Sequence, residues 1–260
     1  MFDLATRHSQ TPGKSTTHAT VHKPSMDNIP AIVTHAISLG CVTQAFSALY
    51  EPSPLSDFAA KQYGGQSVYL TVVGLAITWI YFALALHRDF TDSRAAEINA
   101  QAFGAVAVPL ETLISILYWG IKTAKPELMI PPIEALVLPI KLDLALHLMP
   151  VVLLWFDFLV FQPPFNKSLR PDYIAGLGLL AYCTHIEIAA VKNGRLPYPF
   201  LRLEAPFERL AIYVASAGLF VVLFKLINGL HVQVDRLLDR KTVEAEQYAE
   251  GEVDIMDKQK

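Results

Sequence analysis

Long apolar runs, separated by short polar or proline-containing breaks, dominate the sequence. An α-helix rises ~1.5 Å per residue, so a run of about twenty residues crosses the ~30 Å hydrocarbon core of a bilayer. The pattern therefore predicts an all-α fold, a polytopic membrane helical bundle with about six transmembrane helices. The expected spans are residues 29–50, 67–86, 101–121, 142–161, 173–191 and 207–227.

The breaks between the runs contain residues that end helices. The fourth run stops at Pro163-Pro164 and the fifth at Asn193-Gly194, which is typical of helix C-termini. A proline-spaced apolar stretch, residues 126–139, is too broken for a span, and we expect it to be interfacial or re-entrant. No internal repeat is visible, so one membrane domain is the simplest organisation. The expected parts are a disordered polar N-terminal arm (1–28), a transmembrane helical bundle (29–236) and a flexible charged C-terminal tail (237–260).

The composition agrees with this reading. Hydrophobic residues make up 53% of the 260 residues and charged residues only 17%, which is more apolar and less charged than a typical soluble domain. The formal net charge of -3 is too small to indicate a nucleic-acid partner. The two cysteines, Cys41 and Cys183, lie inside apolar runs and indicate no disulfide framework. We expect no cleavable signal peptide, because the polar N-terminal arm contains no apolar h-region.

Ionisable side chains inside membrane spans are costly and are functional candidates by default. Those within the apolar runs are His35, Glu111, Asp143, His147, Asp157, His185 and Glu187. Six spans place both termini on one side, so the second and fourth spans both enter from the opposite face. Thr71 lies four residues into the second span and His147 five residues into the fourth. Both are therefore expected roughly 6–8 Å below the same face.

A threonine hydroxyl becomes a useful nucleophile when a base withdraws its proton, and histidine is the usual base. A carboxylate can hold the imidazole in the correct tautomer. Asp143, one turn before His147, or Glu187, in the same half of the membrane, could take this part, and His185 could support the site.

Each candidate also has a structural interpretation. A lone threonine near a helix start often donates its hydroxyl to a carbonyl one turn earlier. His147 could serve as an interhelical hydrogen-bonding group. Glu111, Asp157 and His185 are expected to be polar bridges between helices.

Three segments resemble the androgen-induced membrane protein family. The first is Tyr63-Gly64-Gly65-Gln66-Ser67-Val68-Tyr69-Leu70-Thr71, and the second is Asp143-Leu144-Ala145-Leu146-His147 with Asp157 ten positions further on. The third is Asn193-Gly194-Arg195-Leu196-Pro197-Tyr198-Pro199-Phe200-Leu201. Their order and spacing agree with the family over about residues 30–230.

The resemblance implies a multi-pass hydrolase that cleaves fatty acid esters of hydroxy fatty acids with a threonine nucleophile and a histidine. Position by position, these two residues fall on Thr71 and His147. The chain differs from the family's animal members in its polar N-terminal arm, in the proline-rich stretch and in carrying Asp143 where asparagine is found. Oxyanion donors are expected among the backbone amides around Gly64-Gly65.

The leading prediction is an integral-membrane lipid esterase, a carboxylic ester hydrolase of the threonine type, whose partners are a lipid ester substrate and the bilayer. One alternative is a metal-dependent membrane lipid hydrolase that uses His147, His185 and nearby carboxylates. The spans contain no His-x-x-x-His or His-Glu-x-x-His spacing, so we expect neither a metal nor another cofactor. The second alternative is a non-enzymatic small transporter or scaffold. The expected location is the endoplasmic reticulum or another endomembrane rather than the plasma membrane.

Overall fold

The computed structural model describes residues 29–91, 93–128, 137–166, 169–202 and 206–258, with side chains up to residue 238. These residues form helices and connecting turns, without a strand among them, so the all-α prediction is confirmed. The α-helices are α1 (Ile29–Tyr50), α2 (Pro54–Ala60), α3 (Leu70–Phe90), α4 (Arg94–Ala124), α5 (Ile140–His147), α6 (Met149–Phe161), α7 (Pro171–Asn193) and α8 (Pro206–Lys258). Short 3₁₀ turns are η2 (Gly65–Val68), η3 (Pro126–Leu128) and η5 (Pro199–Leu201).

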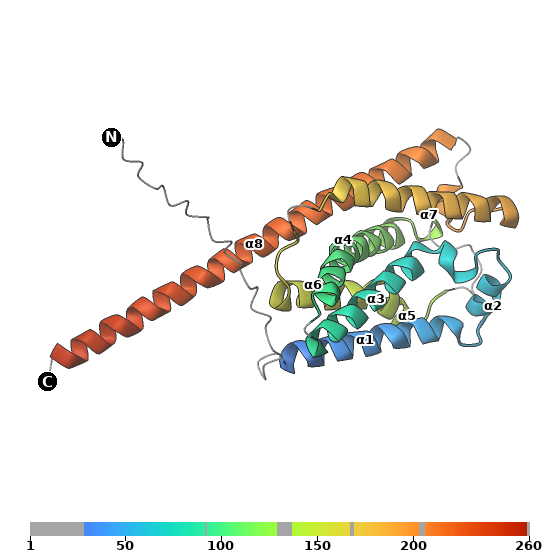
Figure 1. Ribbon diagram of the computed structural model, residues 1–260. Helices are drawn as coiled ribbons and strands as arrows, with labels where there is room; N and C mark the ends of the chain where they lie inside the picture. Colours follow the sequence, from blue (N-terminus) through green and yellow to red (C-terminus); the bar gives the residue numbers. More distant parts are fainter. Residues whose placement is uncertain (1–28, 92, 129–136, 167–168, 203–205, 259–260) are drawn as a thin grey trace, which may run out of the picture.

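Within the described residues, six helical segments are long and apolar enough to cross a membrane. They are α1, α3, α4, α5 together with α6, α7, and the Phe207–Leu238 part of α8. The prediction of a six-span polytopic bundle is therefore confirmed, and the chain is an integral multi-pass membrane protein. Figure 1 shows the helices gathered in one bundle, with the C-terminal part of α8 extending well beyond it.

Local sequence explains where several helices begin and end. The Ser53 hydroxyl accepts from the Ser56 N–H, and the Ser56 side chain binds back to Ser53, which starts α2 at Pro54. The Ser93 hydroxyl accepts from the Ala96 N–H and caps α4. Gly194, with φ of 68°, ends α7 in the left-handed conformation that glycine adopts without strain.

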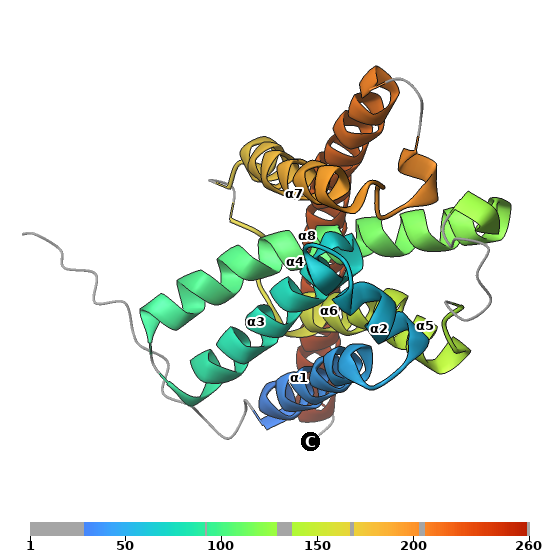
Figure 2. The ribbon, with the colours of Figure 1, turned by 90° about the vertical axis from the view of Figure 1, so that its right-hand side faces the viewer.

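Helix α4 is the central element of the bundle and the most deeply buried span. Helix α3 packs along it, as Figure 2 shows, and α5, α6 and α8 also contact it. Two glycines allow α3 and α4 to approach closely. A Cβ at Gly74 of α3 would lie 2.6 Å from Ile114 and 2.7 Å from Glu111, and a Cβ at Gly104 of α4 would lie 2.9 Å from Tyr81.

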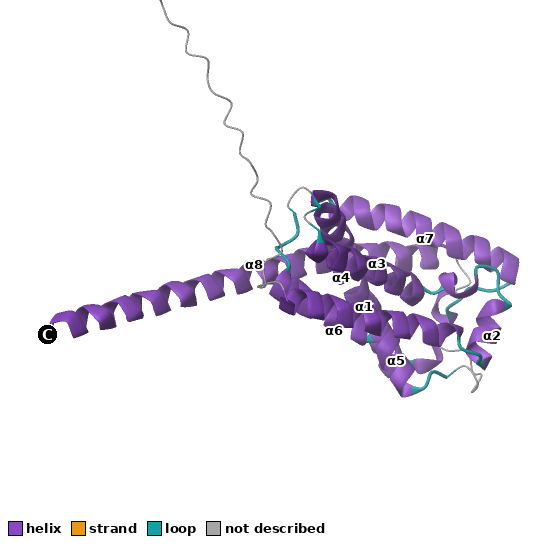
Figure 3. Cartoon of the chain, turned by 60° about the horizontal axis from the view of Figure 1, so that its bottom comes forward, coloured by secondary structure: helices purple, strands orange, loops and turns teal. Residues whose placement is uncertain are grey.

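The fourth span is broken into α5 and α6 directly after His147. Leu148 joins the two helices in a non-helical conformation, with φ of -123° and ψ of -47°. Pro150 follows in the first turn of α6, where its missing N–H cannot continue the hydrogen-bond ladder of α5. The break makes His147 the last residue of the short helix α5, which lies at the lower edge of the bundle in Figure 3.

Buried carboxylates far from Thr71 connect the helices at the other end of α3. The fully buried His35 ring of α1 bonds through Nδ1 to Asp89 of α3 at 2.5 Å and through Nε2 to Asp157 of α6 at 2.6 Å. The Tyr81 hydroxyl also donates to Asp157. In the middle of α3, the Thr78 hydroxyl donates to Glu111 of α4 at 3.3 Å. The expectation that Asp157 and Glu111 are polar bridges between helices is confirmed.

Some predicted parts fall on residues that the structure does not describe. The N-terminal arm, residues 1–28, lies outside the described residues, and of the proline-spaced stretch only residues 126–128 and 137–139 lie within them. Residues 237–258, expected to form a flexible tail, continue helix α8 to Lys258. Their sequence contains four Glu together with Leu, Lys and Ala, which are good helix formers, and the flexibility of this segment stays a prediction.

The close packing of α3 on α4 predicts that Gly74→Ala destabilises the protein. The added methyl would overlap Ile114 and Glu111, and overpacking of this kind costs about 1–3 kcal/mol. The matched control is Gly120→Ala on α4, whose Cβ would meet nothing within 4 Å. Thermal unfolding in detergent should show a lower midpoint for Gly74→Ala only. Equal midpoints for both variants would contradict the packing described here.

Candidate functional site

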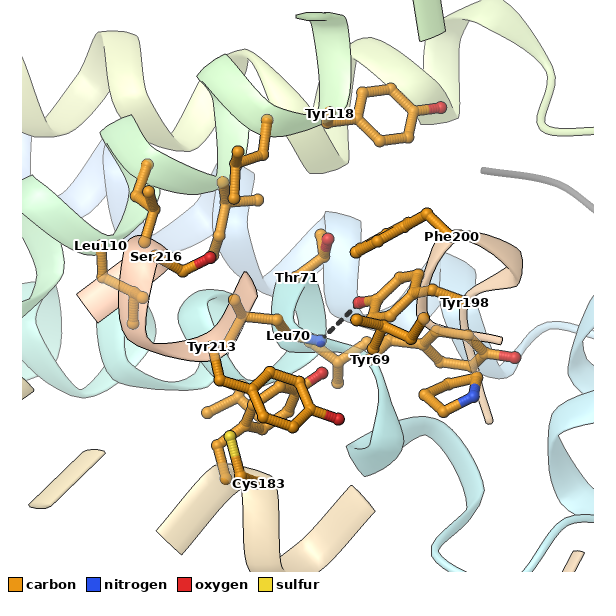
Figure 4. A pocket seen from close by; sticks show the side chains of 18 of the residues that line it. Tyr69, Leu70, Thr71, Leu110, Tyr118, Cys183, Tyr198, Phe200, Tyr213 and Ser216 are labelled. Atoms are coloured by element: carbon orange, nitrogen blue, oxygen red, sulfur yellow. Dashed lines mark hydrogen bonds between the residues drawn. The ribbon is translucent and has the colours of Figure 1, made fainter. Parts of the chain in front are cut away.

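A largely apolar cavity of about 560 Å³ lies among α3, α4, α5, α7, α8 and the turns η2 and η5. Its volume falls in the range of small-molecule sites, about 300–1,000 Å³. Thr71 and His147, the pair predicted from sequence depth, both line it. Figure 4 shows Thr71 pointing from the start of α3 into this space, with Tyr118 of α4 also on its wall.

Thr71 is the second residue of α3. Other threonines in the bundle, such as Thr43 and Thr112, donate their hydroxyls to a carbonyl four residues earlier. Among the described residues, the Thr71 hydroxyl has no hydrogen-bond partner, so the structural interpretation offered for it does not apply. The backbone N–H of Thr71 is also unpaired within the described chain, whereas the next two N–H groups, of Val72 and Val73, both donate to the Tyr69 carbonyl.

The turn before α3 requires glycine. Gly64 and Gly65 have φ of 86° and 52°, in the left-handed region that favours glycine. A Cβ at Gly64 would also lie only 2.7 Å from the Val68 side chain. The compact 3₁₀ turn η2 that follows leads directly into Leu70 and Thr71. The Tyr-Gly-Gly segment is therefore needed to bring the chain abruptly into α3 at the cavity wall.

The end of α7 and the loop after it hold this turn in place. Asn193 accepts from the Tyr63 N–H at 2.8 Å and donates to the Tyr63 carbonyl at 3.1 Å. The Tyr198 hydroxyl accepts from the Leu70 N–H at 2.8 Å, the dashed bond in Figure 4. Since Leu70 is the first residue of α3, Tyr198 satisfies one of the backbone N–H groups that a helix start leaves unpaired.

Burial raises the pKa of the Tyr198 phenol to about 12, although the Leu70 N–H that points at its oxygen opposes this shift. The hydroxyl therefore keeps its proton at neutral pH and accepts the Leu70 hydrogen bond as a neutral group. It binds at the residue before Thr71, so it fixes the start of α3 without placing a charge there.

His147 is oriented by Asp143, one turn earlier on α5. The imidazole Nδ1 lies 3.0 Å from the Asp143 carboxylate and 3.1 Å from the Asp143 carbonyl. Both oxygens accept, so Nδ1 carries the proton and donates it. This fixes the tautomer and leaves Nε2 as the nitrogen with a free lone pair in the neutral ring. The Tyr118 ring stacks on the imidazole, with centroids 3.4 Å apart and planes 1° apart.

The Asp143 carboxylate is fully buried and has three side-chain donors. The Tyr118 hydroxyl and the Lys122 ammonium, one turn apart on α4, both donate to it, in addition to His147. A carboxylate inside a membrane bundle needs such partners because an unpaired buried charge is strongly destabilising. The network ties α4 to α5 and holds His147 against the cavity.

No hydrogen bond joins Thr71 to His147 within the described residues, although both face the same cavity. Catalytic hydrogen bonds are often long or unformed before substrate binds. The arrangement can therefore support proton transfer from the Thr71 hydroxyl to His147 Nε2 once a ligand orders the hydroxyl, and the direct bond stays a prediction.

The other two candidates lie apart from His147. The His185 Nε2 is 3.0 Å from the Ser67 hydroxyl oxygen, next to the Gly64 turn. Glu187 accepts from Arg209 at 3.3 Å and from the Tyr213 hydroxyl at 3.0 Å. Neither His185 nor Glu187 lines the cavity. Of the two carboxylates considered from the sequence, it is Asp143 that contacts the imidazole. Within the described residues, no group of three His, Cys, Asp or Glu side chains is placed to hold a metal ion.

Sequence reasoning missed three residues that shape this site: Tyr118, Lys122 and Tyr198. Tyr118 and Lys122 are spaced i, i+4 and therefore share one helix face, which was a usable signal for a common partner. Tyr198 lies inside a segment that the sequence had singled out, but its partner, the Leu70 N–H, becomes evident only from the fold.

The Tyr198 bond predicts that Tyr198→Phe destabilises the start of α3. The substitution keeps the ring, which packs edge-on against Tyr69, and removes the hydroxyl that accepts from the Leu70 N–H. We expect a loss of about 1 kcal/mol, as for a removed helix cap. Hydrogen exchange at residues 70–72 should be faster than in the native protein. Tyr50→Phe, at an exposed tyrosine, is the control, and identical exchange in all three proteins would contradict the assignment.

Comparison with known proteins agrees with the resemblance seen in the sequence. The profile of the family described as FAR-17a/AIG1-like protein matches residues 32–232. A Schizosaccharomyces pombe (strain 972 / ATCC 24843) protein named as a UPF0641 membrane protein is 26% identical over 208 residues, which cover 80% of this chain and 92% of that protein. No solved structure matches the chain. The matched region contains most of the bundle, including Thr71 and His147, and the chain belongs to the FAR-17a/AIG1-like protein family.

Proposed function

We propose that this membrane protein is a lipid esterase that uses Thr71 as nucleophile and His147 as general base. The observation that carries the proposal is the shared apolar cavity. Its wall holds a threonine hydroxyl without a protein partner and an imidazole whose Nδ1 is bound by a buried carboxylate. A nucleophile, a base and a group that orients the base are the parts that hydroxyl-based acyl transfer requires.

The cavity supports a lipid as the substrate. Leucine, isoleucine, valine and aromatic side chains supply most of its lining, and such walls suit hydrocarbon chains. Membership of the family favours fatty acid esters of hydroxy fatty acids, which carry two chains joined by an ester. Such a substrate would enter from the bilayer between helices, with its ester carbonyl beside Thr71. The endoplasmic reticulum or another endomembrane is the proposed location.

The proposed reaction has two steps. His147 Nε2 takes the proton of the Thr71 hydroxyl as its oxygen attacks the ester carbonyl carbon, and the imidazolium then gives that proton to the leaving alcohol oxygen. This breaks the ester bond and leaves an acyl-threonine. Water then attacks the acyl carbon while His147 removes its proton, and the Thr71 oxygen leaves with a proton from the imidazolium as the acid is released. The Asp143 carboxylate and the Tyr118 ring face both favour the imidazolium.

The oxyanion of each tetrahedral intermediate needs donors. Gly65 was a sequence-based candidate, but its N–H is donated to the Gln62 carbonyl. The Thr71 N–H, unpaired within the described chain and at the positive end of the α3 dipole, is the better candidate. It lies on the same residue as the nucleophile, which suits a short-range contact with the developing charge.

The proposal predicts that Thr71→Ala and His147→Ala lose ester hydrolysis by at least about 100-fold, because each removes a group that bonds or transfers a proton in the reaction. Thr71→Ser keeps a hydroxyl and should retain measurable activity. Thr123→Ala removes an exposed hydroxyl at the end of α4 and is the matched control. Purified proteins in detergent are assayed with a two-chain ester, and folding is checked by thermal unfolding. Hydrolysis by folded Thr71→Ala at the native rate would refute the mechanism.

The position of Asp143 predicts that Asp143→Asn lowers kcat with little change in KM. The amide oxygen still accepts from His147 Nδ1, as is expected in the family members that carry asparagine here, but the negative charge that favours the imidazolium is lost, so we expect a loss of about 10-fold. The matched variant is Glu187→Gln, at a carboxylate that lies outside the cavity wall. Steady-state kinetics should show a lower kcat for Asp143→Asn and native values of kcat and KM for Glu187→Gln. Native kinetics for Asp143→Asn, or an equal loss for Glu187→Gln, would contradict the assigned orienting role.

A further inference from the structure

The charges on the cavity wall come from one short loop. Among the described residues that line the cavity, the fixed charges belong to Arg195 and Arg202, and no carboxylate is present there. The His147 imidazole also lines the cavity, and in its neutral form it adds no charge to the wall. An apolar cavity with two guanidinium groups and no acidic side chain favours a ligand that is itself partly hydrocarbon and partly anionic.

A buried leucine beside each arginine anchors this loop. Leu196, next to Arg195, and Leu201, next to Arg202, are both buried and pack with Ile186 of α7. Between them, Tyr198 is bound to the Leu70 N–H, one residue before Thr71. The backbone beside both arginines is therefore held at the cavity, in the same loop that positions the proposed nucleophile.

Arg195 is already oriented by an aromatic side chain. Its guanidinium carbon lies 4.3 Å from the centre of the Phe58 ring. Stacking of this kind uses the face of the guanidinium and leaves the N–H donors at its edge available. Among the described residues, neither Arg195 nor Arg202 has a carboxylate within ion-pair distance. A planar fork of N–H donors without an acidic partner is suited to a carboxylate, which it can bind through two parallel hydrogen bonds.

We propose that Arg195 and Arg202 bind the free carboxylate of the ester substrate and thereby select acidic lipid esters over neutral ones. The inference rests on the proposed esterase function and adds the direction in which the substrate lies. Its anionic end contacts the loop that carries η5, its ester carbonyl lies at Thr71, and its hydrocarbon chains occupy the apolar wall formed by α4, α7 and α8.

The test compares two substrates that differ only in this group: a fatty acid ester of a hydroxy fatty acid and its methyl ester. The native protein, Arg195→Gln, Arg202→Gln and the double variant are assayed in a neutral detergent. The native protein should prefer the free acid by about 10-fold to 100-fold in kcat/KM, the size expected for hydrogen bonds to a charged group. The double variant should lose this preference through a higher KM for the acid, with the methyl ester hydrolysed as before.

Arg170→Gln is the control for a general loss of positive charge, because Arg170 is exposed, pairs with Asp172 and lies outside the cavity. It should keep the native preference. Arg195→Lys keeps the charge but loses the planar fork, and it should retain only part of the preference.

The outcomes distinguish a failure of the arginine assignment from a failure of the proposed esterase function. A native protein that hydrolyses both substrates, with a preference for the acid that survives the double substitution, overturns the arginine assignment and leaves the esterase intact. Equal hydrolysis of acid and methyl ester by the native protein overturns it as well. A native protein that hydrolyses neither substrate contradicts the esterase function and the arginine site with it.

Discussion

The buried carboxylate of Asp143 is the constraint on which the candidate site depends. Inside a membrane bundle an ionised carboxylate persists only with donors around it, and Tyr118, Lys122 and His147 supply them. Meeting this requirement fixes three things together: the position of α5 against α4, the tautomer of the imidazole, and the face of the ring that lies on Tyr118. The chemistry proposed for His147 follows from how the fold satisfies one charge.

The nucleophile is positioned by neutral hydrogen bonds. The glycine turn brings the chain into α3, Asn193 holds that turn through Tyr63, and Tyr198 caps the first residue of the helix. These groups come from sequence segments more than a hundred residues apart. Their convergence explains why the Tyr-Gly-Gly segment and the Tyr-Pro-Phe-Leu segment occur in one chain: the first delivers Thr71 to the cavity and the second keeps it there.

The sequence predicted the architecture well because the bilayer imposes a simple rule, about twenty apolar residues for each span. The same rule gave the depth of Thr71 and His147, and both line one cavity. The depth of a residue in the membrane does not give the rotation of its helix, so it could not show which carboxylate orients His147. In the structure Asp143 contacts the imidazole, whereas Glu187 binds Arg209 and Tyr213. Contacts between distant segments, such as that between Tyr198 and Leu70, depend on loop geometry that no local pattern encodes.

The most direct test of the central claim is to locate the covalent adduct of a fluorophosphonate probe by peptide mass spectrometry. The probe traps an activated hydroxyl, and two other hydroxyls provide internal comparison: Ser216, which also lines the cavity, and Ser67, which is bound to His185. The account predicts an adduct on Thr71 that disappears in His147→Ala. An adduct on Ser67 or Ser216, or labelling of Thr71 that is unchanged in His147→Ala, would contradict it.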